Sequence, residues 1–87
     1  MNKMIWVIVI DEVCDFVNYP TMPYAYSKEE DARKAFAKLK ASAMEEYADE
    51  LEEYDWAVTD KTNYFEIYND NYSKDHYRID LYQINVE

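Results

Sequence analysis

The longest continuous apolar stretch lies near the start of the chain. Seven consecutive residues, Met4–Ile10, are apolar, and most of them are β-branched. A strand that is apolar at every position has both faces buried, so this stretch predicts an interior strand of a sheet. We expect the strand to end near Asp11 and Glu12, the first charged residues after it.

A less regular segment follows. Cys14–Pro23 contains an asparagine and two prolines and is typical of a loop. Met22–Tyr26 predicts a short edge strand, in which Pro23 limits pairing because proline has no N–H to donate.

Apolar residues then recur at three- and four-residue steps, the spacing of one face of a helix. They are Ala32, Ala35, Phe36, Leu39, Ala43, Tyr47, Leu51 and Tyr54. Ser27 with Glu30 three residues later is a capping-box pattern and predicts the helix start. No glycine or proline interrupts the segment before residue 54. A helix of that length would span about 40 Å, more than a small domain needs, so we expect a bend or break near Lys40–Ala43.

Three strands are predicted after the helix. Trp56–Thr59 and Tyr64–Tyr68 are rich in β-branched and aromatic residues, and Asp60–Asn63 between them has the composition of a turn. Asn69–Asp75 is the next predicted turn, and His76–Val86 is a long last strand.

The last strand changes phase along its length. Ile79 and Leu81 lie on one face of an ideal strand, whereas Ile84 and Val86 lie on the other. A β-bulge near Tyr82-Gln83 would return all four to one face, so we expect a bulge there.

Together these elements predict a single α+β domain over residues 1–87. Four or five strands form an antiparallel sheet, and one long helix covers one of its faces, in the order β(β)αβββ. We expect the uncovered face to show tyrosine and charged side chains.

The composition adds one constraint on the turns. The chain has 87 residues and no glycine. Any left-handed backbone position must therefore fall to asparagine or aspartate, which tolerate it best among the other residues. The cluster Asn69-Asp70-Asn71 meets that requirement.

Charge is divided unevenly along the chain. Residues 1–40 carry six acids and six bases, so the whole net charge of −10 lies in residues 41–87. The densest acidic segment contains no base; its acids are Glu45, Glu46, Asp49, Glu50, Glu52, Glu53 and Asp55. Such a field repels nucleic acids and anionic membranes and attracts basic protein surfaces.

The acidic segment opposes the predicted helix. Glu45–Asp49, Glu46–Glu50 and Asp49–Glu53 are repulsive i,i+4 pairs, and acids at a helix C-terminus oppose its dipole. A charge cluster kept at that cost favours a binding surface for a basic partner. The alternative is a solvated face that serves solubility.

Tyrosine is the second excess, with ten in the chain. In the stretch 64–72 aromatic residues are interleaved with acids, and Tyr64, Tyr68 and Tyr72 would add contact area to the acidic patch if they point outward. The alternative is ordinary strand alternation, with Phe65 and Ile67 inward and the tyrosines as cross-strand partners.

No residue pattern indicates catalysis, a metal or a cofactor. Cys14 is the only cysteine and has no cationic neighbour in sequence, so we interpret it as a buried small hydrophobe. His76 is the only histidine, and we interpret it as a strand-edge residue. The segment starting at Asp70 resembles a calcium loop superficially, but lacks the sixth-position glycine and has Leu81 at the twelfth position. We expect no catalytic, metal or cofactor site.

The cellular location is predicted from two kinds of segment that the sequence lacks. No apolar run reaches about 18 residues, and no cleavage site follows Met4–Ile10, so we expect neither a membrane span nor a secretory signal. A single cysteine, which cannot form an internal disulfide, suits a reducing compartment. The expected location is the cytoplasm.

In overall character the chain resembles the small acidic inhibitors that phages and mobile elements make against host defence nucleases, including anti-CRISPR proteins and other DNA mimics. The resemblance depends on its small size, missing glycine and acidic, tyrosine-rich sequence, above all at 45–55 and 64–72. It implies a non-enzymatic role and a basic partner protein.

The leading hypothesis is therefore a non-enzymatic acidic protein that occupies a basic, nucleic-acid-handling surface of a partner and binds no nucleic acid or membrane itself. The predicted partner-binding residues are Glu45, Glu46, Asp49, Glu50, Glu52, Glu53, Tyr64, Tyr68 and Tyr72. The alternative is a small adaptor or self-associating domain, with which a homodimer is compatible. A third hypothesis, an enzyme with a carboxylate site, requires a deep pocket that holds His76 with paired carboxylates.

Overall fold

A computed structural model of the chain describes residues 3–14, 17–21, 23–69 and 75–86. It contains six strands and two helices: β1 (Lys3–Cys14), β2 (Val17–Pro20), β3 (Tyr24–Tyr26), α1 (Glu29–Glu46), α2 (Ala48–Glu53), β4 (Ala57–Lys61), β5 (Tyr64–Tyr68) and β6 (His76–Val86).

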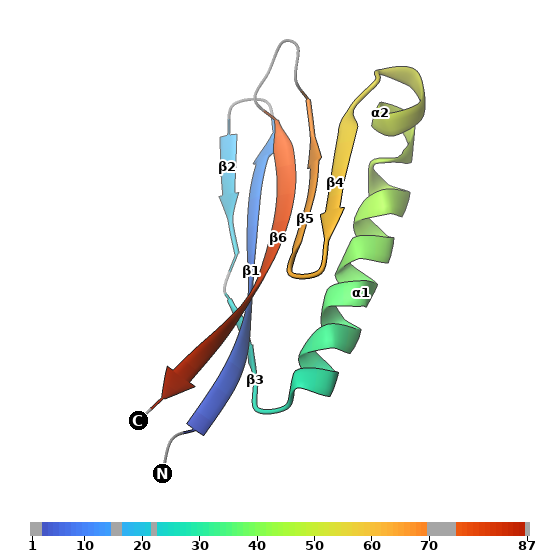
Figure 1. Cartoon of the computed structure of the whole chain (residues 1–87). Helices are drawn as coiled ribbons and strands as arrows, with labels where there is room; N and C mark the ends of the chain where they lie inside the picture. Colours follow the sequence, from blue (N-terminus) through green and yellow to red (C-terminus); the bar gives the residue numbers. More distant parts are fainter. Residues whose placement is uncertain (1–2, 15–16, 22, 70–74, 87) are drawn as a thin grey trace.

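The strands form one antiparallel sheet, covered on one face by α1 (Figure 1). The strand order is β2-β1-β6-β5-β4. β3 pairs with the same edge of β1 as β2 does, but at residues 6–8 of β1 rather than at residues 11–14. The α+β class, the antiparallel sheet and the interior position of Met4–Ile10 are confirmed. Burial of both faces of this strand is not: Ile8 and Ile10 are buried, whereas Ile5 and Val7 on the other face are partly exposed. The predicted bounds of β5 and β6 agree with the structure.

The core lies between α1 and the sheet. Strand alternation sends Ile8 and Ile10 of β1, Phe65 and Ile67 of β5, and Ile79 and Leu81 of β6 toward the helix. The buried apolar residues are Ile8, Ile10, Ala32, Phe36, Ala43, Tyr47, Phe65, Ile67, Ile79 and Leu81. Two alanines of α1 in this set leave room for the helix to approach the strands.

The predicted break in the helix lies at Tyr47, not at Lys40–Ala43. Ala43 is 2% exposed and packs against the sheet, so the helix stays straight there. Tyr47 has φ −101° and ψ 20°, which ends α1 and starts α2. Its ring is buried and its hydroxyl reaches β1, and this anchor holds the chain where its direction changes.

The predicted capping box does not form. Lys28, with extended backbone, is the N-cap residue, and no side chain caps the first turn. Glu30 instead pairs with Lys34 at 3.3 Å, so its carboxylate is engaged forward along the helix rather than backward. The companion pair of Glu29 and Arg33, at 3.4 Å, is also present.

The segment predicted as a loop contains a strand. β1 continues past Asp11 to Cys14, and β2 folds back on it, from Asp11 opposite Pro20 to Cys14 opposite Val17. The charges of Asp11 and Glu12 do not end β1, because Asp11 pairs with His76 and Arg78 and Glu12 accepts a hydrogen bond from Tyr47.

The predicted β-bulge in the last strand is absent. β1 and β6 keep one register from Lys3 opposite Val86 to Val13 opposite His76. Ile84 therefore stays on the face opposite α1, where it is 43% exposed, and Tyr82 beside it is 50% exposed. We call this uncovered side of the sheet the open face. It shows tyrosine and charged side chains, as predicted, together with an apolar strip.

The left-handed position in the described chain belongs to Asp55, with φ 57°. It follows α2, where the N–H groups of Tyr54 and Trp56 both donate to the carbonyl of Glu50. Aspartate thus takes the helix-end role that usually falls to glycine. The sequence predicted the residue type, but at Asn69-Asp70-Asn71, of which only Asn69 lies within the described residues.

Asp55 provides a direct test of this turn. Asp55→Gly should raise the free energy of unfolding by about 0.5–1 kcal/mol, because glycine adopts positive φ without a Cβ clash. Asp55→Val should lower it by about 1–2 kcal/mol. Urea unfolding followed by circular dichroism measures both, and equal effects of the two substitutions would contradict the assigned conformation.

Candidate functional site

The acidic segment forms one end of the molecule. Its seven carboxylates extend from the last turn of α1 through α2 to Asp55, and we call this end the acidic pole; its residues are Glu45, Glu46, Asp49, Glu50, Glu52, Glu53 and Asp55. All are exposed except Glu50, which is partly buried. Among the residues that the structure describes, no base forms an ion pair with any of them.

The ion pairs of the chain lie elsewhere. Lys40 of α1 bonds Asp60 of β4 at 2.9 Å, and Arg78 of β6 bonds Asp80 at 3.1 Å and Asp11 at 3.4 Å. These pairs balance charge within the sheet and along α1. The acidic pole has no base paired with it among the described residues, and a field of this sign attracts a basic partner.

The break at Tyr47 changes the electrostatics of the pole. Asp49 and Glu50 lie in the first turn of α2, where the helix dipole favours acids. The expectation that every acid here opposes a helix end is therefore wrong. The last turn of α1, with Glu45 and Glu46, and the last turn of α2, with Glu52 and Glu53, do combine acids with the negative end of a helix dipole.

A hollow of about 300 Å³ opens at the side of the acidic pole, between β1, β2 and the helices. Its lining residues are Glu12, Cys14, Tyr19, Glu46, Tyr47 and Glu50. Three carboxylates from three different elements thus line one concave surface, with tyrosines among them. We call this feature the acidic hollow.

Tyr47, between the two helices, connects them to the sheet at the acidic hollow. Its hydroxyl donates a hydrogen bond of 2.5 Å to Oε2 of Glu12, and its ring lies 5.7 Å from that of Trp56 and 6.0 Å from that of Tyr77. Burial raises the pKa of Tyr47 far above its ordinary value, and the bond to Glu12 and the charges of Glu12 and Glu46 raise it further. Tyr47 therefore stays neutral and keeps donating to Glu12.

Sequence reasoning found Glu46 and Glu50 but missed Glu12 and Tyr19. The sequence pattern predicts that Glu12 ends a strand and that Tyr19 lies in a loop. Their place in the hollow depends on the β1–β2 hairpin and on a contact between residues 12 and 47. No local pattern in the sequence carries that information.

The predicted tyrosines do not join the acidic pole. Phe65 and Ile67 point toward α1, so Tyr64 and Tyr68 lie on the open face, on the other side of the sheet. The Tyr64 hydroxyl donates to Glu66 at 2.7 Å; burial and then this bond raise its pKa to about 12. Tyr72 lies outside the described residues.

His76 belongs to a charged network on the open face. Its Nε2 lies 2.9 Å from Oδ2 of Asp11, which also pairs with Arg78. His76 is at the start of β6 and does not line the acidic hollow. Within the described ranges no three His, Cys, Asp or Glu side chains are grouped so that they could hold a metal ion.

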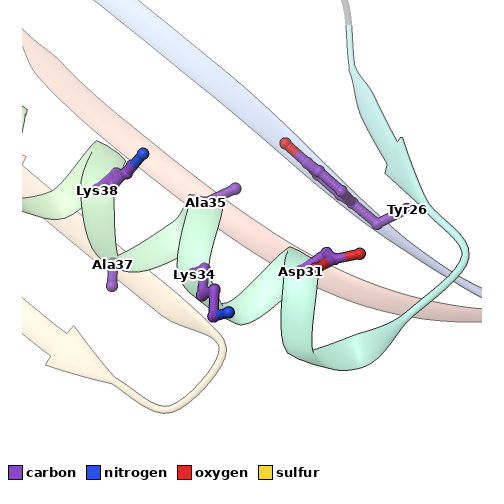
Figure 2. A pocket seen from close by; sticks show the side chains of 6 residues that line it. All are labelled: Tyr26, Asp31, Lys34, Ala35, Ala37 and Lys38. Atoms are coloured by element: carbon purple, nitrogen blue, oxygen red, sulfur yellow. The ribbon is translucent and has the colours of Figure 1, made fainter.

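A second hollow lies at the other end of α1. Figure 2 shows Tyr26 of β3 across from the helix residues that complete it, and its volume is about 560 Å³. The lining residues are Tyr26, Asp31, Lys34, Ala35, Ala37 and Lys38. Its wall is largely apolar with two lysines at the rim, so its chemistry is unlike that of the acidic hollow.

Comparison with known proteins gives no match: no family model fits this chain, and neither a curated protein nor a solved structure is similar to it. The resemblance to anti-CRISPR inhibitors and other DNA mimics stays a prediction. Of the two described helices, neither combines the length and apolar character that crossing a membrane requires.

Two charge reversals test the electrostatics of α2. Glu53→Lys should stabilise the fold by about 0.5–1 kcal/mol, because it removes the repulsion from Asp49 and places a cation at the helix end. Asp49→Lys removes the same repulsion but loses a favourable position in the first turn, so its net effect should stay within about 0.5 kcal/mol of zero.

The two variants have the same net charge, so thermal melting at matched ionic strength compares position alone. A larger gain from Asp49→Lys than from Glu53→Lys would show that α1 and α2 behave as one continuous helix.

Proposed function

We propose that this protein is a non-enzymatic, cytoplasmic binding protein that occupies a basic, nucleic-acid-handling surface of another protein. The observation that carries the proposal is the acidic hollow, where Glu12, Glu46 and Glu50 line a concave site beside further uncompensated carboxylates. The proposed class is that of DNA mimics such as anti-CRISPR inhibitors of defence nucleases.

The charge density of the pole supports mimicry of a nucleic-acid backbone. Four carboxylates lie within residues 49–53 of α2, which is about one charge per 2 Å along the helix axis. Duplex DNA carries about one charge per 1.7 Å. A surface that evolved to bind phosphates therefore meets a comparable field at this end of the molecule.

The acidic hollow is suited to bind an arginine side chain of the partner protein as an anchor. A guanidinium is planar, donates to carboxylates in pairs and stacks on aromatic rings. Glu46 and Glu50 offer acceptors from two helices, and Tyr19, which is 49% exposed, offers a ring. An arginine that holds a phosphate in the nucleic-acid complex would be held here by carboxylates instead.

An oligo-arginine peptide is a suitable probe of this site. Glu46→Gln with Glu50→Gln should weaken peptide binding by about tenfold or more, because two charge-assisted hydrogen bonds are lost. The matched control, Glu29→Gln with Glu30→Gln, removes the same charge at the far end of α1 and should weaken binding less than about threefold. Isothermal titration calorimetry at several salt concentrations measures both, and wild-type affinity should fall as salt rises.

Equal losses in the two double variants would show that net charge alone attracts the peptide and that the hollow is not a site. Binding of duplex DNA by the wild-type protein at moderate salt would contradict mimicry itself.

A further inference from the structure

One edge of the sheet is open at the end opposite the acidic pole. β5 pairs with β6 only from His76 to Asp80, and β3 pairs with β1 only from Trp6 to Ile8. Within the described residues, β6 beyond Asp80 therefore pairs with β1 alone. In Figure 1 this two-stranded part extends past the β4–β5 turn toward both chain ends. We call the side of Leu81–Val86 that faces away from β1 the free edge.

The backbone of the free edge is oriented to accept another strand. The N–H of Leu81 donates to the carbonyl of Asn63 at 2.9 Å, so it points away from β1. Backbone direction alternates along an antiparallel strand, which places the N–H and C=O groups of Gln83 and Asn85 on the same side. These four groups face the free edge.

The other sheet edges carry features that discourage pairing. β4 has Asp60 and Lys61, β2 is four residues long and ends in Pro20, and β3 has three residues. Charges, prolines and short length are the usual protections of an edge strand. The free edge has none, since Leu81–Val86 contains no charged residue and no proline.

An apolar strip runs beside the free edge on the open face. With no bulge in β6, Ile84 lies opposite Ile5 and Tyr82 lies opposite Val7. Ile5 and Val7 are partly exposed, and the two β6 side chains more so. Apolar side chains flanking an unprotected edge favour strand addition, because the added strand covers them as its backbone pairs.

We propose that a second copy of this chain occupies the free edge, with two β6 strands pairing antiparallel about a two-fold axis. Gln83 then lies opposite the partner's Asn85, and Ile84 lies opposite the partner's Ile84. This register uses all four outward backbone groups of each copy, and it closes after two copies because the same edge serves both. The proposal goes beyond the proposed function and does not depend on it.

The lack of charge at the free edge favours a second copy of this chain over a basic partner as the occupant. Two chains of net charge −10 repel one another wherever their acids meet. Residues 4–10 and 81–86, however, contain no acid and no base. The molecule is 50 Å long, and the acidic pole lies at its other end, so edge pairing keeps the two poles several screening lengths apart. A basic partner has no acid to pair with at this edge.

Sedimentation equilibrium of the full chain tests the proposal. The wild type should reach a dimer as concentration rises, and more completely at high salt, because salt screens the repulsion between copies. Ile84→Lys puts like charges opposite each other at the two-fold axis and should raise the dimer dissociation constant about tenfold or more. The matched control is Met44→Lys on α1, where the replaced side chain is also 43% exposed; its dissociation constant should not rise.

Gln83→Pro is a second variant. It removes an outward N–H, together with the exposed contact of the Gln83 side chain with Met4, and leaves the backbone groups that pair with β1 in place, so β1–β6 pairing should survive while dimerisation weakens. Circular dichroism checks that each variant folds. A wild type that stays monomeric at all concentrations, assemblies larger than a dimer, or equal dissociation constants for Ile84→Lys and Met44→Lys would overturn the proposal. Binding of the oligo-arginine peptide should be unchanged in Ile84→Lys, so this proposal and the proposed function fail separately.

Discussion

The hydrogen bond between Tyr47 and Glu12 joins the helical layer to the sheet at the point where the chain changes direction. Tyr47 ends α1, starts α2 and packs against the rings of Trp56 and Tyr77. Glu12 would otherwise be a half-buried carboxylate without a partner, beside Glu46 of α1 and Glu50 of α2. The hydroxyl satisfies it there, and the acidic hollow exists because that charge is retained rather than replaced by an apolar residue.

Acids that pair with a base and acids that do not lie in different parts of the protein. On the sheet, Asp11 contacts His76 and Arg78, Asp80 pairs with Arg78, and Asp60 pairs with Lys40. Acids on α2 are left unmatched in solvent, where a carboxylate costs little to keep. The fold thus places the unpaired acids of α2 at one end of the molecule, away from the uncharged segment Leu81–Val86 of β6.

The sequence predicted most elements because their signals are local. Alternation in Tyr64–Tyr68 and the three- and four-residue steps of α1 each depend on neighbouring residues only. The errors have a different origin. β2, the break at Tyr47 and the unbroken register of β6 all depend on contacts between distant residues, such as the pairing of Asp11 with Pro20. For the candidate site, the local charge of the sequence is enough to locate the acidic pole. Glu12 joins the acidic hollow only through the fold. Tyr64 and Tyr68 are not part of the site, because strand alternation points their side chains to the opposite face of the sheet.

The left-handed turn at Asp55 has a consequence for the unfolded chain. Glycine would adopt that conformation more easily, yet the protein contains none. A chain without glycine has fewer backbone conformations to lose when it folds, and each such replacement elsewhere is worth about 0.4–1 kcal/mol when the native geometry tolerates it. The strain accepted at one turn is thus small beside the reduced conformational entropy of the whole unfolded ensemble. The absence of glycine therefore favours folding through the unfolded chain, which has less conformational freedom to lose.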